Sequence, residues 1–310
     1  MKKLLVLALA LALALCLALA AQADVATEQL TVPSTLREGA EIPVFVTLPE
    51  DPAAANGAVV MIHGHGGNHN EWGGFDAISN GVAESGKIVA TLDFPGCGDS
   101  AESFQLNTLT NMKQDVADVI AYLKANYGVE SVEAFGYSMG GRIILEMIVE
   151  DAADFSAVEF VAPAEDYADL KGLFGGAEAW EDLSATAHAE GYVVFTTIYG
   201  QVQELSAAWF DDLAKYEDGL AEAAAAKYDG PVIVIYATDD EAVAPAISQG
   251  VADAFGAKVF NTYTAGHSYS FYSDDPEVVS TVNDNSIGFL ADPEGFLAEC
   301  GLADRHSAVK

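Results

Sequence analysis

Residues 136–140 read Gly-Tyr-Ser-Met-Gly, and no other stretch constrains the fold as strongly. An apolar run at 132–135 precedes this stretch, and apolar residues at helical spacing follow it at 143–148. The glycines on either side of Ser138 remove the steric clash in a tight, strained turn between a strand and a helix. Such a turn lifts the serine hydroxyl above the sheet, so the pattern predicts that Ser138 is a nucleophile.

Outward from this turn, short apolar runs alternate with helical patterns. The apolar runs lie at 58–62, 88–92, 132–135, 157–161, 232–236 and 258–263. Runs of this kind are typical of strands buried on both faces, and residues 42–48 alternate loosely as an exposed strand. Helical spacing occurs at 112–123, 143–148, 246–255 and 277–290. The alternation predicts an α/β fold with a mostly parallel sheet flanked by helices.

One segment interrupts this alternation. Residues 163–230 contain no clear buried strand, but they carry several aromatic residues and a helix-like run at 221–226. A long segment without structure is uncommon in a compact domain. We therefore expect a helical insertion that packs over one end of the sheet, with its aromatic residues as its own packing core. The region 24–310 is otherwise expected to form a single domain.

A serine needs a neighbouring base to become a good nucleophile. His267 follows the last predicted strand, late in the chain, as the order serine, acid, histidine requires. His188 lies in the insertion and His306 in the C-terminal tail, and neither follows a core strand. We therefore predict that His267 is the general base.

The acid that orients the histidine is expected in the loop after strand 232–236. This loop offers three consecutive carboxylates, Asp239, Asp240 and Glu241. The role of the acid is to fix the tautomer of the imidazole and to stabilise the imidazolium. The spacing alone leaves the choice open between the two aspartates.

The loop at 63–67, which reads His-Gly-His-Gly-Gly, follows the strand at 58–62. Acyl transfer needs backbone N–H groups that point at the developing oxyanion. The expected donors are the N–H groups of Met139, directly after the serine, and of His65 in this loop. The alternative is a metal site at His63, His65 and His69. Gly67 stands where such a site needs an aspartate, and no second ligand set has suitable spacing, so no metal or other cofactor is expected.

The first 23 residues have the three-part pattern of a secretory signal peptide. Two lysines precede an apolar run from Leu4 to Ala20, and Ala21-Gln22-Ala23 provides small residues for cleavage. The pattern predicts a secreted protein that has no membrane segment after the signal is removed. Cys97 and Cys300 would remain, and their spacing does not reveal whether they pair.

The charge of the chain limits its partners. Beyond residue 23 there remain 11 of the 13 basic residues and all 47 acidic residues, a net charge near −36. A surface of this charge repels nucleic acids and anionic membranes and favours a soluble monomer. The expected partner is therefore a small molecule.

In combination these motifs resemble the α/β-hydrolase superfamily, within it the branch of cinnamoyl and feruloyl esterases, monoacylglycerol-lipase-like enzymes and serine aminopeptidase-like proteins. The resemblance rests on the stretches at 63–67, 93–100, 136–141, 240–243 and 266–267, and it spans about residues 40–290. It implies an α/β-hydrolase fold with a lid at about 163–230. It also implies a triad of Ser138, His267 and Asp240, because the family has an aspartate three residues before a valine.

The implied activity is hydrolysis of a small carboxylic ester through an acyl-enzyme, without a cofactor. Two alternatives stay open: a serine peptidase that uses the same triad on amides, and a non-catalytic binding protein on the same scaffold. The sequence departs from the family at Ala237, where glycine is common, and at Tyr137, where histidine is frequent. Neither position belongs to the triad.

Overall fold

The structure is a computed structural model, and it describes residues 25–197, 200–262, 266–271 and 275–301. The expected signal peptide at 1–23 and His306 lie outside the described residues. Within the described part of the chain, no helix is long and apolar enough to cross a membrane.

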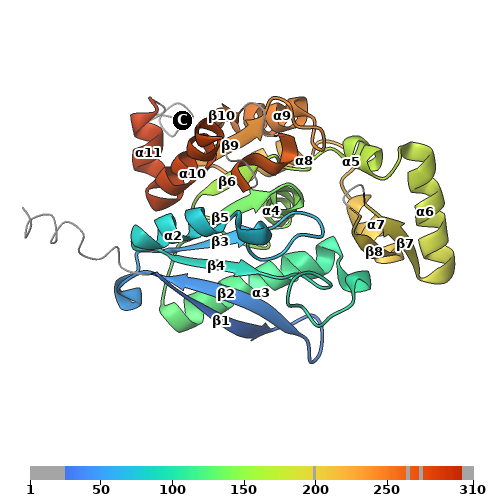
Figure 1. Cartoon of the computed structure of the whole chain (residues 1–310), viewed down its shortest axis with the longest axis horizontal. Coiled ribbons are helices and arrows are strands. Elements are labelled where there is room, and N and C mark those ends of the chain that lie inside the picture. The colour runs from blue at the N-terminus through green and yellow to red at the C-terminus, as the bar shows by residue number, and fades with distance from the viewer. Residues whose placement is uncertain (1–24, 198–199, 263–265, 272–274, 302–310) are drawn as a thin grey trace, which may run out of the picture.

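The described residues form a mixed sheet of eight strands in the order β1-β2-β4-β3-β5-β6-β9-β10 (Figure 1). The strands are β1 (Ala26–Pro33), β2 (Glu41–Leu48), β3 (Ala58–Ile62), β4 (Ile88–Leu92), β5 (Val132–Tyr137), β6 (Val158–Val161), β9 (Val232–Ala237) and β10 (Lys258–Thr262). β2 pairs antiparallel with β1 and with β4, and the other neighbouring strands pair parallel. The predicted α/β-hydrolase fold with a mostly parallel sheet is confirmed.

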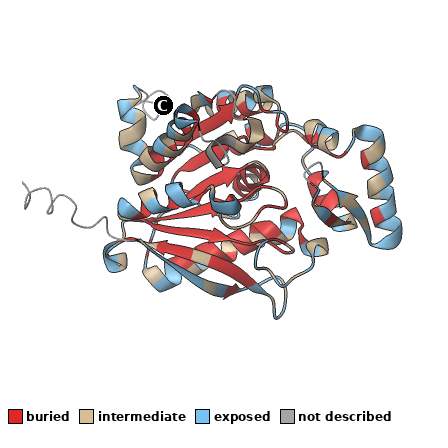
Figure 2. Ribbon diagram, in the orientation of Figure 1, coloured by how far each residue is buried: buried red, intermediate tan, exposed pale blue. Residues whose placement is uncertain are grey.

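Burial follows the position of each strand in the sheet. Every residue of β3, β4, β5, β6 and β9 is buried, as their apolar runs predict (Figure 2). Two expectations are wrong. β2 is largely buried rather than exposed, because it lies between β1 and β4. β10 is mostly half-buried rather than buried on both faces, because it is the edge strand of the sheet.

Two groups of helices flank the sheet (Figure 1). In the first group, α2 (Asp76–Glu84) packs against α10 (Pro276–Ala291), which also contacts α11 (Pro293–Glu299). In the second group, α4 (Met139–Val149) packs between α3 (Leu109–Tyr127) and α8 (Leu220–Ala225), and α8 contacts α9 (Pro245–Phe255). Short 3-10 helices complete the described elements: η1 (Pro52–Ala54), η2 (Glu71–Gly73), η3 (Phe104–Leu106) and η4 (Gly266–Phe271).

The insertion, residues 163–230, is not helical throughout. Besides α5 (Tyr167–Leu173), α6 (Ala177–Glu190), α7 (Ala207–Leu213) and α8, it contains the antiparallel strands β7 (Tyr192–Thr196) and β8 (Val202–Ser206). This hairpin and α6 lie beside the sheet in Figure 1. The rings of Trp180, Trp209, Phe174 and Phe210 pack against one another and are buried, and Phe195 joins them at Phe174. The insertion thus has its own aromatic core.

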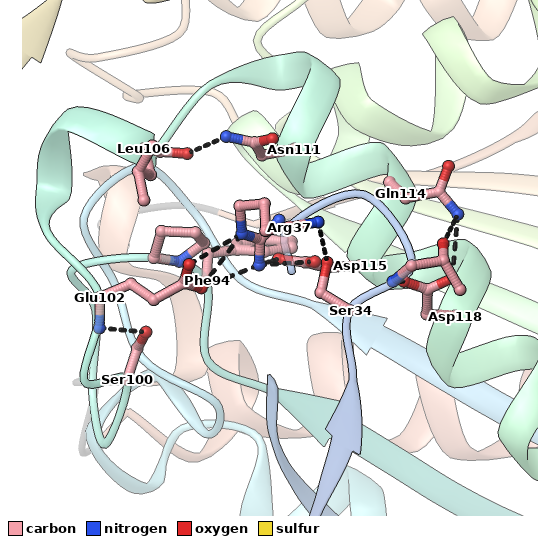
Figure 3. A network of polar contacts seen from close by, with 12 residues as sticks. Ser34, Arg37, Phe94, Ser100, Glu102, Leu106, Asn111, Gln114, Asp115 and Asp118 are labelled. Carbon is pink, nitrogen blue, oxygen red and sulfur yellow. Dashed lines mark hydrogen bonds and ion pairs between the residues drawn. The ribbon is translucent and has the colours of Figure 1, made fainter. Parts of the chain in front are cut away.

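A half-buried ion-pair network fastens the first hairpin to the rest of the domain (Figure 3). Arg37, between β1 and β2, donates from Nε and Nη2 to the carboxylate of Glu102, over 2.9 Å in each case. The same Nη2 lies 2.9 Å from Oδ1 of Asp115 on α3. Arg37 therefore links three parts of the chain: the hairpin, the loop after β4, and α3. The loop after β4 lies at the strand ends that carry the candidate site.

Candidate active site

Ser138 lies in the turn between β5 and α4, in a strained backbone conformation. Its φ of 52° and ψ of −115° are uncommon for a residue with a side chain. A Cβ on Gly140 would collide with the backbone oxygen of Ile62, and one on Gly136 would lie 2.6 Å from Cδ1 of Ile144. Only glycine therefore fits at both positions, and Ser138 is held at the carboxyl end of the central strand.

The side chains of His267 and Asp240 continue from Ser138 in one hydrogen-bonded chain. The Oγ of Ser138 lies 3.0 Å from Nε2 of His267, which belongs to η4. The Nδ1 of His267 lies 2.9 Å from Oδ2 of Asp240, in the loop after β9. A proton on Nδ1 leaves Nε2 as an acceptor for the serine hydroxyl. The structure thus brings together the three side chains that the sequence singled out.

The carboxylate of Asp240 is well supplied with donors. Burial would raise the pKa of Asp240, but the hydrogen bond from His267 and the backbone N–H groups of Val243 and Ala242 outweigh burial and lower it. Both N–H groups lie 2.9 Å from Oδ1 of Asp240. The side chain is therefore held as a carboxylate facing the imidazole.

The two neighbouring carboxylates contact the backbone beside the histidine. Asp239 accepts a hydrogen bond from the N–H of Gly266 over 3.3 Å, and Glu241 accepts one from the N–H of His267 over 3.3 Å. The two contacts distinguish Asp239 and Glu241 from Asp240, which bonds the ring. The choice between the aspartates, which the spacing left open, therefore favours Asp240 on geometry.

Tyr137 is a further support that the sequence analysis did not identify. Its hydroxyl donates to the carbonyl oxygen of His267 over 2.6 Å. Its ring stacks on the imidazole, with centroids 5.1 Å apart and planes inclined by 30°. The only sign of this role in the sequence was that Tyr137 stands where the family frequently has histidine.

The loop at 63–67, which we call the histidine–glycine loop, lies against the serine. A Cβ on Gly64 would lie 3.4 Å from Cβ of Ser138. Among the described residues, neither the N–H of His65 nor that of Met139 has a hydrogen-bond acceptor. Glu71 supports the loop, because its Oε1 accepts the N–H of Gly64 over 2.8 Å. The pKa of Glu71 is raised to about 7 by burial.

The three histidines of the metal alternative contact different partners. His63 Nδ1 bonds the oxygen of Gly64 over 2.7 Å, and His65 Nε2 bonds Oε1 of Gln203 over 2.8 Å. His69 Nδ1 lies 3.2 Å from Oδ1 of Asp93. Burial lowers the pKa of His63 and that of His65 to about 4, so both rings are neutral at pH 7. No group of three or more possible metal ligands gathers anywhere in the described ranges.

Cys97 and Cys300 are both free thiols in the structure. Cys97 is buried, and burial raises its pKa to about 12. A thiol with so high a pKa is a poor nucleophile at neutral pH. Ser138 is therefore the better candidate for attack on a substrate.

Comparison with known proteins places the chain in a family and supports its fold. Residues 59–282 match the model of the Alpha/beta hydrolase family. Est1E from Butyrivibrio proteoclasticus, solved with bound ferulic acid, is 18% identical and superposes with a TM-score of 0.69, over 84% of this chain and 97% of that one. A soluble variant of monoglyceride lipase from Saccharomyces cerevisiae, solved with a substrate analogue, is 16% identical with a TM-score of 0.66, over 87% and 96% of the two chains.

A curated protein is similar over a shorter stretch. The dihydrolipoyllysine-residue acetyltransferase component of the acetoin cleaving system of Cupriavidus necator is 28% identical over 175 residues, 56% of this chain. The match covers 43% of the length of that protein, so less than half of the relative has a counterpart here.

Proposed function

The chain belongs to the alpha/beta hydrolase family, and from this premise we propose that it is a secreted serine hydrolase that cleaves carboxylic esters. The observation that carries the proposal is the hydrogen-bonded chain from Ser138 through His267 to Asp240, with distances of 3.0 Å and 2.9 Å. Acyl transfer needs a serine on a strained turn, a histidine whose Nε2 faces the serine hydroxyl, and a carboxylate on the other side of the imidazole.

In the first half of the reaction, Oγ of Ser138 attacks the acyl carbon of the ester while Nε2 of His267 takes its proton. The electron pair of the carbonyl moves to the oxygen, which accepts hydrogen bonds from the backbone N–H groups of His65 and Met139. The tetrahedral intermediate collapses, the C–O bond to the alcohol breaks, and His267 returns the proton to the leaving oxygen. Asp240 stabilises the imidazolium throughout.

In the second half, water replaces the alcohol. His267 takes a proton from the water as its oxygen attacks the acyl carbon on Ser138. The same two N–H groups hold the second oxyanion, and collapse breaks the bond to Oγ of Ser138, which recovers its proton from His267. The free acid leaves, and no step requires a cofactor.

Two further observations support an ester as substrate. The structural relatives Est1E and monoglyceride lipase were solved with ferulic acid and with a substrate analogue, respectively. The net charge of −34 favours a small neutral substrate over a polyanion. We propose that the protein acts as a monomer outside the cytoplasm, in keeping with the N-terminal signal pattern.

The test is a release assay on the protein without residues 1–23. The substrates are p-nitrophenyl acetate and butyrate, methyl ferulate and an aminoacyl-nitroanilide, and Ser138→Ala is assayed in parallel. The proposal predicts ester turnover that the substitution abolishes. Preferential cleavage of the nitroanilide would instead establish an amide hydrolase. Turnover that survives in Ser138→Ala, or no turnover by the unaltered protein, would contradict the proposal.

A further inference from the structure

The hairpin of the insertion is hydrogen-bonded directly to the histidine–glycine loop. Gln203 on β8 is fully buried, and its Oε1 lies 2.8 Å from Nε2 of His65. Gln201, which precedes β8, donates from Nε2 to the backbone oxygen of Gly66 over 2.9 Å. The two glutamines thus bind the side chain and the carbonyl of adjacent residues in the loop that faces Ser138.

The hydrogen bond between the side-chain amides of Gln203 and Gln201 fixes how each amide is oriented. Nε2 of Gln203 donates to Oε1 of Gln201 over 3.0 Å, so Oε1 of Gln203 must be the atom that faces His65. His65 is neutral at pH 7, because burial lowers its pKa to about 4. Its single ring proton therefore lies on Nε2 and is donated to Gln203. The three bonds run in one direction, from His65 through both glutamines to Gly66.

Packing leaves little freedom around this chain of bonds. The ring of His65 packs against Phe174 and Trp209 of the insertion, with centroid distances of 6.0 Å and 5.4 Å. A Cβ on Gly66 would lie 2.5 Å from Nε2 of Gln203 and would also collide with Gln201. The loop is thus held between the insertion on one side and Glu71, which bonds Gly64, on the other.

The N–H of His65, one of the two expected oxyanion donors, belongs to the residue that Gln203 holds. We propose that Gln203 is a positioning residue for the reaction: through His65, and through Gln201 and Gly66, it holds this donor towards Ser138, so the insertion hairpin completes the oxyanion site. The inference rests on the proposed function and goes beyond it, because it assigns a role in transition-state stabilisation to a segment outside the sheet.

The experiment compares Gln203→Met, which keeps the volume but removes both polar ends, with Gln203→Glu, which keeps an acceptor for His65. Gln105→Met is the matched control, because Nε2 of Gln105 also joins the hairpin, at Glu204 over 2.9 Å, but within the described residues it makes no hydrogen bond to the loop. The readouts are the rate of Ser138 modification by a fluorophosphonate probe, kcat and KM for the preferred ester, their pH profiles, and the thermal unfolding midpoint.

Loss of one direct oxyanion donor costs on the order of 10²–10³ in kcat, so a displaced donor should cost about ten- to 100-fold. We expect this loss in kcat and in the modification rate for Gln203→Met, with KM and the shape of the pH profile unchanged. Gln203→Glu should recover most of the rate, and Gln105→Met should equal the unaltered protein. If Gln203 had only a structural role, Gln203→Met would lower the thermal unfolding midpoint without lowering kcat selectively over KM.

The outcomes separate the two proposals. If the unaltered protein neither reacts with the probe nor turns over esters, the proposed function and this inference both fail. If it reacts and Gln203→Met matches Gln105→Met, only the role of Gln203 fails. If Gln203→Met does not fold, Gln201→Met takes its place, and an unchanged kcat in that variant overturns the inference.

Discussion

At the residue scale, consecutive carboxylates after β9 differ in what they contact. Asp240 bonds the imidazole of His267, whereas Asp239 and Glu241 bond the backbone of Gly266 and His267. The carboxylate that faces Nδ1 fixes the tautomer of the ring, and the other two hold the short η4 segment in place. The three carboxylates are chemically similar, but Asp240 acts on the imidazole and the other two on the backbone.

Replacement of Asp240 by asparagine should lower kcat by on the order of 10³–10⁴, because an amide favours the wrong tautomer of His267. Asp239→Asn is the matched control, and it should change kcat by less than about ten-fold, since it weakens one backbone bond. Steady-state kinetics on the preferred ester measures both. A larger loss in Asp239→Asn than in Asp240→Asn would reverse the assignment.

Tyr137→Phe removes the hydroxyl that holds the carbonyl of His267 but keeps the stacked ring. A neutral hydrogen bond contributes about 0.5–1.5 kcal/mol, so kcat should fall about two- to ten-fold while KM is unchanged. Tyr236→Phe serves as the control, because its hydroxyl bonds Gln249 over 2.7 Å instead of His267. Equal kinetics for the two variants would show that the hydroxyl of Tyr137 does not position the histidine.

The serine and the acid loop could be predicted because each follows a strand with a largely apolar run. The histidine could be predicted because it lies late in the chain, in the order serine, acid, histidine. Tyr137 and Gln203 could not, because their contacts join segments that are distant in sequence. Glu71 is only seven positions from Gly64, which it bonds, but it carries no recognisable motif. Gln203 and His65 are 138 positions apart, and neither carries a local pattern that points to the other. Supporting residues of this kind become visible only when the chain has folded.

At the scale of elements, the insertion is fastened at two places to the helix that follows the serine. The buried guanidinium of Arg142 on α4 donates to the carbonyl of Glu165, before α5, over 2.7 Å. It also donates to the carbonyls of Leu213 and Tyr216, near the end of α7, over 3.1 Å and 3.0 Å. Arg142, four residues after Ser138, thus joins the start of the insertion to the end of α7 and the residues that follow it.

Arg142→Met should destabilise the protein by about 3–5 kcal/mol, because it removes one partner of the buried pair with Glu146 and leaves the carbonyls without a donor. The control is Lys227→Met, whose pair with Asp151 is exposed and should contribute less than about 1 kcal/mol. Urea unfolding measures both. Similar losses in the two variants would mean that Arg142 does not anchor the insertion.

The hairpin of the insertion was not predicted, and the reason is visible in its residues. In β8, Gln203 is buried while Val202 is 65% exposed, which inverts the usual apolar pattern of a strand. The polar residue is inside because it bonds His65. β1 was missed for a related reason: it is an edge strand with mostly exposed residues and no apolar run.

At the scale of the whole molecule, buried acids couple stability to pH. Glu159 on β6 is fully buried, and burial raises its pKa to about 8 despite the hydrogen bond from Ser286. Among the described residues, its Oε2 has no hydrogen-bond partner. The folded state therefore keeps a proton that the unfolded state, with a pKa near 4.5, releases. This contribution is complete below pH 4.5 and is lost as the pH rises through 8.

Glu159→Gln should remove this dependence, because glutamine does not titrate. The stability of the variant relative to the unaltered protein should rise between pH 5 and pH 9, by at most roughly 1.4 kcal/mol for each unit of pKa difference. Urea unfolding at the two pH values provides the measurement. Parallel pH dependences for both proteins would show that Glu159 does not hold its proton in the folded state.

In the proposed reaction, Ser138 carries the acyl group of the ester during turnover. The most direct measurement is mass spectrometry of the protein quenched in acid while it turns over p-nitrophenyl butyrate, followed by digestion to locate the modified residue. We expect one added butyryl group, on the peptide that contains Ser138, which disappears when the substrate is exhausted and does not form in Ser138→Ala. A butyryl group on another residue, or turnover without any acylated protein under conditions where deacylation is rate-limiting, would contradict the proposed reaction.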